Sequence, residues 1–176
     1  MRAQLDFDKS VKKHRLVFKL TTDLFFSRLL DNSLWFIFLA CVCFLVVNKN
    51  NYTSARDVLF VSLFVILAIW LIVGLLVINK LVIIKGSNVE DNRRKIIQLL
   101  NDSSPNLILN DSGQKIIRYN LRTGLFNWGK QITIVFHEKN ILMNITTFGR
   151  YEIRSPFHAI FHIWTIKQII RQFERK

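Results

Sequence analysis

Two uninterrupted apolar runs dominate the pattern of apolar and polar positions in the first half of the chain. The second run, residues 58–78, has no charged residue and only one hydroxyl side chain, that of Ser62. Its length is close to the roughly 20 residues with which an α-helix crosses a hydrocarbon core of about 30 Å. A buried helix of a soluble protein normally shows a polar stripe over such a length, and this run shows none. The pattern therefore predicts a transmembrane helix over residues 58–78.

The first apolar run, residues 34–47, is shorter than a bilayer crossing normally requires. An Asp-Asn-Ser sequence at residues 31–33 offers N-cap side chains, and Trp35 lies where an interfacial aromatic residue is expected. We therefore predict a second spanning helix, and with it a two-helix transmembrane hairpin over residues 34–79. The alternative is a buried core helix or a re-entrant segment. Thinning of the bilayer or oligomerisation would accommodate the short span.

The N-terminal arm, residues 1–33, mixes basic and large apolar side chains. Residues 9–31 predict a basic amphipathic helix, in which Lys and Arg reach toward lipid headgroups while Phe and Leu enter the acyl boundary. Phe25, Phe26 and Arg28 are therefore predicted to lie at the membrane interface. The arm is either a simple juxtamembrane helix or an interfacial helix that packs against neighbouring subunits and helps to shape a pore.

The distribution of charge sets the orientation of the hairpin. Of the 25 Lys and Arg residues, seven precede residue 34, two lie within residues 48–57 and sixteen follow residue 78. Because Lys and Arg accumulate on the cytoplasmic side of membrane proteins, we expect both termini in the cytoplasm. A net charge of +13 beside 51% hydrophobic residues also argues against an ordinary soluble protein. We predict a multi-pass membrane protein, with the lipid bilayer as its first partner.

The remaining chain, residues 80–176, predicts a basic cytoplasmic domain. Apolar positions at helical spacing indicate one helix over residues 88–101 and another that follows Ser155 and Pro156. Alternating segments between them indicate an antiparallel meander of three or four strands. The expected strands are residues 107–109, 115–122, 131–138 and 141–148. The predicted fold class is a membrane α+β protein with an N-terminal amphipathic helix, a two-helix transmembrane hairpin and a cytoplasmic helix–antiparallel meander–helix domain.

Candidate chemistry concentrates where the last predicted helix begins. Arg150, Arg154 and His158 surround a helix start at Ser155, where free backbone N–H groups favour an anion. With Arg154 as a clamp and His158 as acid or base, such a site would act on a phosphate; anion binding and a structural role are the alternatives. His158 and His162 are four residues apart, as in metal sites, but no third ligand is placed to complete the set. We expect neither a metal nor a cofactor.

A second basic stretch lies in the predicted meander around Arg118 and Arg122. Two lysines and three aromatic residues share it: Lys115, Lys130, Tyr119, Phe126 and Trp128. Basic residues interleaved with aromatic ones are typical of RNA binding, and equally of contact with an anionic lipid surface. Arg118 and Arg122 therefore join Arg150 and Arg154 as candidate residues for binding an anion or RNA.

A short, basic chain with an N-terminal membrane anchor and the pair Arg154 and His158 near its C-terminus resembles the small membrane accessory proteins of type VI-B CRISPR–Cas systems. Those proteins accompany an RNA-guided effector that cleaves RNA, and they carry a divergent motif of the HEPN ribonuclease type, in which an Arg precedes a His. In this chain three residues separate the two, fewer than in the family's motif. The resemblance implies Arg154 and His158 as the motif residues.

The resemblance also implies a function, that of a membrane-embedded accessory protein in RNA-guided antiphage defence. Such a protein is linked functionally to an RNA-targeting effector nuclease. It is expected to assemble with itself into a homo-oligomeric pore that permeabilises or depolarises the inner membrane. Two alternatives stay open: a membrane-tethered module that binds lipid or protein, similar to bacterial pleckstrin-like anchored proteins, and a divergent membrane-bound ribonuclease. Apart from that ribonuclease, we do not expect an enzyme.

Overall fold

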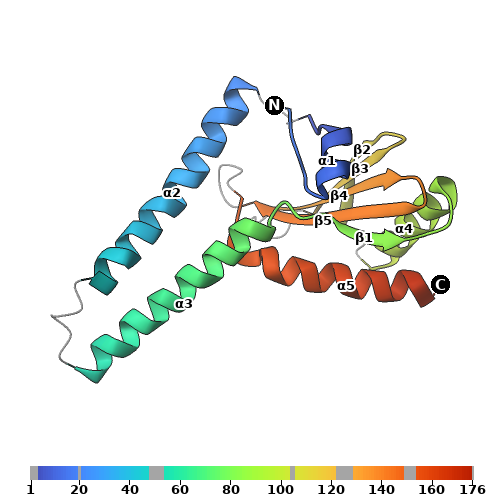
Figure 1. The fold of residues 1–176 in the computed structure, drawn as a ribbon. Helices are drawn as coiled ribbons and strands as arrows, with labels where there is room; N and C mark the ends of the chain where they lie inside the picture. The colour runs from blue at the N-terminus through green and yellow to red at the C-terminus, as the bar shows by residue number, and fades with distance from the viewer. Residues whose placement is uncertain are drawn as a thin grey trace.

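The computed structural model of this chain describes residues 4–19, 21–47, 54–103, 106–121, 129–148 and 154–175. Over these ranges the protein combines α-helices with one antiparallel sheet, so the α+β part of the predicted fold class is confirmed. Two long helices lie side by side and project from a domain in which the sheet is covered on both faces (Figure 1).

The two long helices are α2 (Thr22–Val47) and α3 (Ala55–Val77). α3 begins with a capping box, in which the backbone N–H of Asp57 donates to Ser54 Oγ and the backbone N–H of Ser54 donates to Asp57 Oδ2, both at 3.3 Å. Among the described residues, α3 is the one helix long and apolar enough to cross a membrane, and the apolar part of α2, Trp35–Val47, is shorter. The helix predicted over residues 58–78 is therefore confirmed as a helix, while the transmembrane hairpin stays a prediction.

The N-terminal arm is not the single helix predicted over residues 9–31. The first helix, α1, covers only Phe7–Lys13 and is capped by Asp6, whose carboxylate accepts the backbone N–H of Lys9 (3.2 Å). His14 then adopts a left-handed conformation with φ at 47°, and its backbone N–H bonds to carbonyls of the last turn. This conformation ends α1, and the chain turns back along the sheet domain.

The residues after His14 are extended because they pair with distant parts of the backbone. Leu16 donates its backbone N–H to the Asn79 carbonyl oxygen (2.7 Å), and Asp6 donates its own to Val17 (2.8 Å). α2 begins only at Thr22, so the predicted N-cap at residues 31–33 was wrong: these residues lie inside the helix. Local amphipathic spacing does not reveal partners that lie more than sixty positions away in the sequence.

The sheet has five strands in the order β1-β5-β4-β3-β2, and each neighbouring pair is antiparallel. The strands are β1 (Val82–Lys85), β2 (Leu107–Ser112), β3 (Ile116–Leu121), β4 (Gly129–His137) and β5 (Asn140–Phe148). β2 to β5 form the predicted meander, with a tight β4–β5 turn in which Glu138 has a φ of 51°. β1 was not predicted: this short strand follows the exit of α3 and adds an edge to β5.

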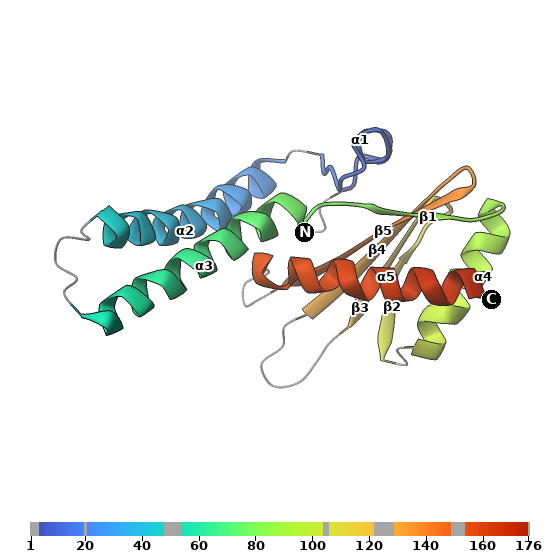
Figure 2. The ribbon, with the colours of Figure 1, turned by 60° about the horizontal axis from the view of Figure 1, so that its bottom comes forward.

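Helices cover the two faces of the sheet unequally. α4 (Val89–Ser103) and α5 (Ala159–Arg175) pack on one face and enclose the larger core (Figure 2). A short 3-10 helix, η3 (Pro156–His158), leads into α5, which agrees with the helix start predicted at Ser155 and Pro156. The N-terminal residues, including Leu5 and Leu16, cover a smaller core on the opposite face. The beginning and the end of the chain thus build one domain.

Candidate functional site at the end of the apolar helix

The C-terminal part of α3 packs directly on the segment that leads into α5. At Gly74 the α3 backbone lies so close to the carbonyl group of Pro156 that a Cβ atom would overlap it. One turn earlier, Trp70 donates its indole N–H to the carbonyl oxygen of Phe157 (3.0 Å). A small residue permits such an approach of two backbones, so Gly74 fixes α3 against the domain.

Aromatic rings extend this contact to both long helices. Trp35 of α2 meets Phe157 edge-on, with 5.4 Å between ring centroids. Trp70 of α3 lies against Phe161 of α5 at 5.6 Å. Edge-on and tilted arrangements at such separations are favourable for aromatic pairs. We call these four residues, Trp35, Trp70, Phe157 and Phe161, the junction cluster.

Polar side chains satisfy the backbone where α3 ends. The last carbonyl groups of a helix lack partners within the helix, and a cation is favoured there. Arg15 Nη2 donates to the carbonyl oxygen of Leu76 (2.6 Å). Asn144 Nδ2 donates to the carbonyl oxygens of Ile78 (3.0 Å) and Lys80 (2.8 Å). The helix end is therefore bonded both to the N-terminal segment and to β5.

Arg154, the predicted clamp, lies at this junction. Its Nη1 donates to Asn79 Oδ1 (2.7 Å), just after the end of α3. Its guanidinium group lies 4.8 Å from the ring centroid of Phe18 and 6.0 Å from that of Phe148. Arg154 thus joins the N-terminal segment, the exit of α3 and the end of β5.

His158, the second predicted motif residue, has its own set of partners. Its Nδ1 lies 3.0 Å from Ser155 Oγ, and its ring stacks on that of His162 with 6.3 Å between centroids. The His162 ring is buried, and its Nε2 lies 2.6 Å from Thr147 Oγ1. Burial first, and then the charge of Lys130, lowers the pKa of both histidines; the pKa of His162 falls to about 4. His162 is therefore neutral at physiological pH.

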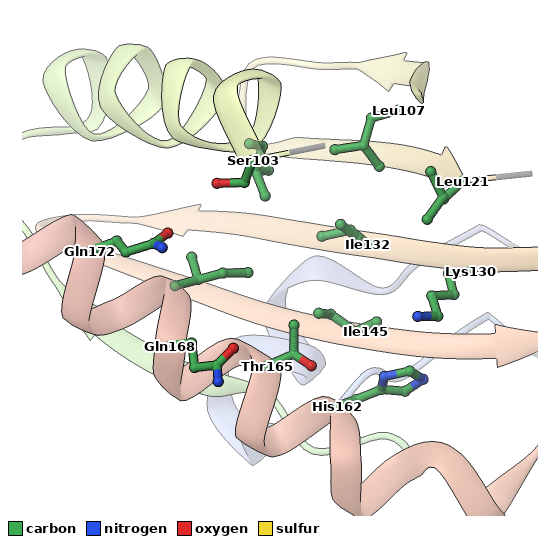
Figure 3. Close-up of a pocket in the computed structure, with 12 residues that line it drawn as sticks. Ser103, Leu107, Leu121, Lys130, Ile132, Ile145, His162, Thr165, Gln168 and Gln172 are labelled. Atoms are coloured by element: carbon green, nitrogen blue, oxygen red, sulfur yellow. The ribbon is translucent and has the colours of Figure 1, made fainter. Parts of the chain in front are cut away.

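A cavity of about 230 Å³ opens beside His162, between α5 and the sheet. Its floor is apolar and includes Ile132 and Ile145, while Gln168 and Gln172 of α5 line the other side (Figure 3). Lys130 and His162 stand together at one end of the cavity (Figure 3). The cavity thus combines an apolar floor with a localised positive charge.

The other predicted site residues do not gather at this junction. Arg118 lies on β3 opposite Thr133 of β4, and because side chains alternate along a strand it points away from the face covered by α5. Arg122 and Arg150 lie outside the described residues, so no basic cluster with Arg154 can be described. Phe25 is about half exposed on α2, and the side chains of Phe26 and Arg28 also lie outside the described part.

Several residues of the junction were not predicted from the sequence. Gly74 interrupts a long apolar run, which is a recognisable sign of close helix packing. Asn144 is a polar residue within the buried run of β5. A buried polar side chain normally has a hydrogen-bond partner, but the sequence does not show which group that is. No local signal connects Arg15 with Leu76, because the contact depends on how the whole domain closes.

Comparison of the sequence with known proteins assigns the chain to no family, because no family model and no curated protein matches it. Over the described residues, no group of three or more His, Cys, Asp or Glu side chains could hold a metal ion.

Replacing Gly74 with alanine should loosen the junction. The added Cβ meets the backbone of Pro156, and such overpacking costs about 1–3 kcal/mol, more than alanine contributes to a helix. We expect a lower unfolding temperature in detergent micelles, measured by intrinsic fluorescence. Gly129→Ala is the matched control, because nothing lies within 4 Å of its Cβ position. Equal unfolding temperatures for the two variants would contradict the close packing at Gly74.

The buried His162 should make stability depend on pH. Its pKa is lowered in the folded state, so between about pH 6.5 and 4 the unfolded chain binds the proton more readily. The free energy of unfolding should be fully present above about pH 6.5 and decline toward pH 4, by up to about 1.4 kcal/mol per pH unit. Chemical denaturation across this range would measure the slope. His162→Gln should flatten it, and an unchanged slope in that variant would exclude His162 as the cause.

Proposed function

We propose that α3, with α2 beside it, anchors a basic α+β binding domain at the cytoplasmic face of the bacterial inner membrane. The observation that carries this proposal is the exposed apolar surface of α3. Within α3 the buried residues are Ala68, Leu71 and Gly74, whereas Leu59 and Ile66 have 72% and 61% of their surface exposed. Each large apolar side chain left in water forgoes about 1.5–3 kcal/mol, so a bilayer is the natural environment for this helix.

The arrangement of the helices supports a common side for both ends of the chain. The start of α2 and the end of α3 both lie toward the sheet domain (Figure 1). Residues 5–18 belong to the packing of that domain, so a pair of spanning helices would leave them on the same side as α5. The excess of Lys and Arg in these parts makes the cytoplasm the expected side.

The junction cluster supports a position for the domain at the membrane interface. Trp and Tyr favour the interface between hydrocarbon and water, because one part of the ring is apolar and another part is polar. Trp35 and Trp70 come from different long helices and meet the same turn of chain at Phe157. Their position near the end of α3 is consistent with the membrane interface predicted for Trp35.

The cavity beside His162 supports a binding role and indicates a ligand class. Among the described residues that line it, Lys130 carries the one formal charge, since His162 is neutral. An amphiphile with an anionic group at Lys130 and an apolar body over Ile132 and Ile145 would complement this lining. We therefore propose a membrane-tethered module that binds a lipid-like anion.

The role implied by the resemblance stays a prediction, including antiphage defence, the homo-oligomeric pore, the effector nuclease as partner and RNA binding. The partners of Arg154 and His158 within the fold support structural roles for these two residues rather than ribonuclease chemistry. The multi-pass topology is part of the present proposal.

Membrane anchoring is tested by extraction and by labelling. We expect the full chain to stay in bacterial membranes after alkaline carbonate washing. In a background with Cys41 and Cys43 replaced by serine, Arg56→Cys should react with an impermeant maleimide in spheroplasts. Arg175→Cys, at a position that is also exposed in the described structure, should react only after lysis. Release by carbonate would refute the anchor, and the opposite labelling pattern would refute the orientation.

The ligand class is tested with a fluorescent fatty acid, cis-parinaric acid, added to the protein in nanodiscs and to empty nanodiscs. Lys130→Gln should weaken the protein-dependent binding about tenfold, the effect of losing one charge-assisted hydrogen bond. Lys139→Gln is the matched control, because Lys139 lies on the exposed β4–β5 turn away from the cavity. Equal binding by these variants, or no binding beyond the empty nanodisc, would refute the cavity as a lipid site.

A further inference from the structure

The outward face of α5 has large aromatic side chains that the domain does not use. Ile166, Ile169 and Phe173 of α5 are buried against the sheet, as an amphipathic helix requires. On the other side, Phe161 and Trp164 have 57% and 69% of their surface exposed. Two such rings at a spacing of one helical turn form a continuous apolar surface on the first half of α5.

This aromatic surface is continuous with the exposed apolar surface of α3. Phe161 belongs to the junction cluster through its contact with Trp70, and Trp164 follows it one turn along α5. The first turns of α5 lie beside the end of α3 in both overall views (Figures 1 and 2). A bilayer that surrounds α3 up to Trp70 therefore meets Phe161 and Trp164 next.

The charges on α5 complement an anionic surface at the same place. Lys167 and Arg171 are both exposed. Lys167 follows Trp164 by three residues and Arg171 follows Lys167 by four, so the three lie on one side of the helix. The one acidic residue of α5, Glu174, lies beyond them near the C-terminal end of the helix. Aromatic residues followed by basic ones are the arrangement with which interfacial helices contact lipids, the rings in the headgroup region and the cations at phosphates.

We propose that the outer face of α5 is a lipid-contacting surface, in which Phe161 and Trp164 enter the membrane interface and Lys167 and Arg171 bind anionic phospholipid headgroups. Because this surface would be a second contact with the bilayer besides α3, it would fix the orientation of the domain relative to the membrane. This inference rests on the proposed membrane anchoring by α3, and it adds the lipid class that the domain recognises.

The test measures whether Trp164 touches lipid in the full-length protein. The protein is reconstituted into nanodiscs of phosphatidylcholine, with and without phosphatidylglycerol, made from ordinary or brominated acyl chains. Bromine quenches tryptophan on contact, and the emission of wild type minus that of Trp164→Phe isolates the signal of Trp164. We expect brominated chains to remove most of this difference signal, and phosphatidylglycerol to deepen the quenching.

The basic residues are tested in the same experiment. Lys167→Gln combined with Arg171→Gln should abolish the additional quenching caused by phosphatidylglycerol, whereas Lys139→Gln on the distant β4–β5 turn should retain it. An unfolding temperature close to that of the wild type would establish that Trp164→Phe leaves the fold intact. If this variant unfolds at a lower temperature, Trp164→Tyr takes its place in the difference measurement.

The failure of this inference and the failure of the anchor are distinguishable. If the protein resists carbonate extraction but the Trp164 signal is the same in brominated and ordinary bilayers, the α5 surface does not touch lipid, and the anchor stands. If quenching occurs but does not change with phosphatidylglycerol, the headgroup preference is refuted. If carbonate releases the protein, both the anchor and the α5 surface fall together.

Discussion

The structure depends on the contact between the backbone of α3 at Gly74 and the turn at Pro156. Because Gly74 has no side chain, the α3 backbone lies directly against the carbonyl group of Pro156. The indole bond from Trp70 to Phe157 then restricts rotation about the axis of α3. The position of α5, and with it the aromatic surface and the cavity beneath it, follows from where this contact places the chain.

The same region also satisfies the end of the apolar helix. The last carbonyl groups of α3 have no partners within the helix and need other donors. Arg15 and Asn144 supply those donors, and Arg154 bonds to Asn79 immediately beyond them. His162 stays neutral for a related reason: charging a ring buried among such contacts, near Lys130, would be unfavourable.

Elements held by contacts between residues close in sequence could be predicted, whereas those that depend on contacts between distant residues could not. The meander and the helices α4 and α5 follow from local periodicity, and their predicted positions agree with the structure to within a few residues. The single helix predicted for the N-terminal arm was wrong because residues 14–18 pair with distant backbone. Strand β1 was not predicted because four residues are too few to show a clear alternation of apolar and polar positions. The sequence identified Arg154 and His158 as candidate site residues from their spacing. Spacing alone could not predict that Arg154 bonds to Asn79 and that His158 lies against Ser155.

The pairing of the N-terminal segment with the chain after α3 has a consequence for biosynthesis. The backbone bonds from Leu16 to Asn79 and from Leu81 to His14 join residues that leave the ribosome on either side of both long helices. The N-terminal segment therefore waits, with its apolar residues unpaired, until α2 and α3 have been made and the first strand has emerged. A chain that stalls before residue 81 therefore leaves Leu5 and Leu16 without Leu81 and the strand residues that bury them, and such exposed apolar side chains favour aggregation.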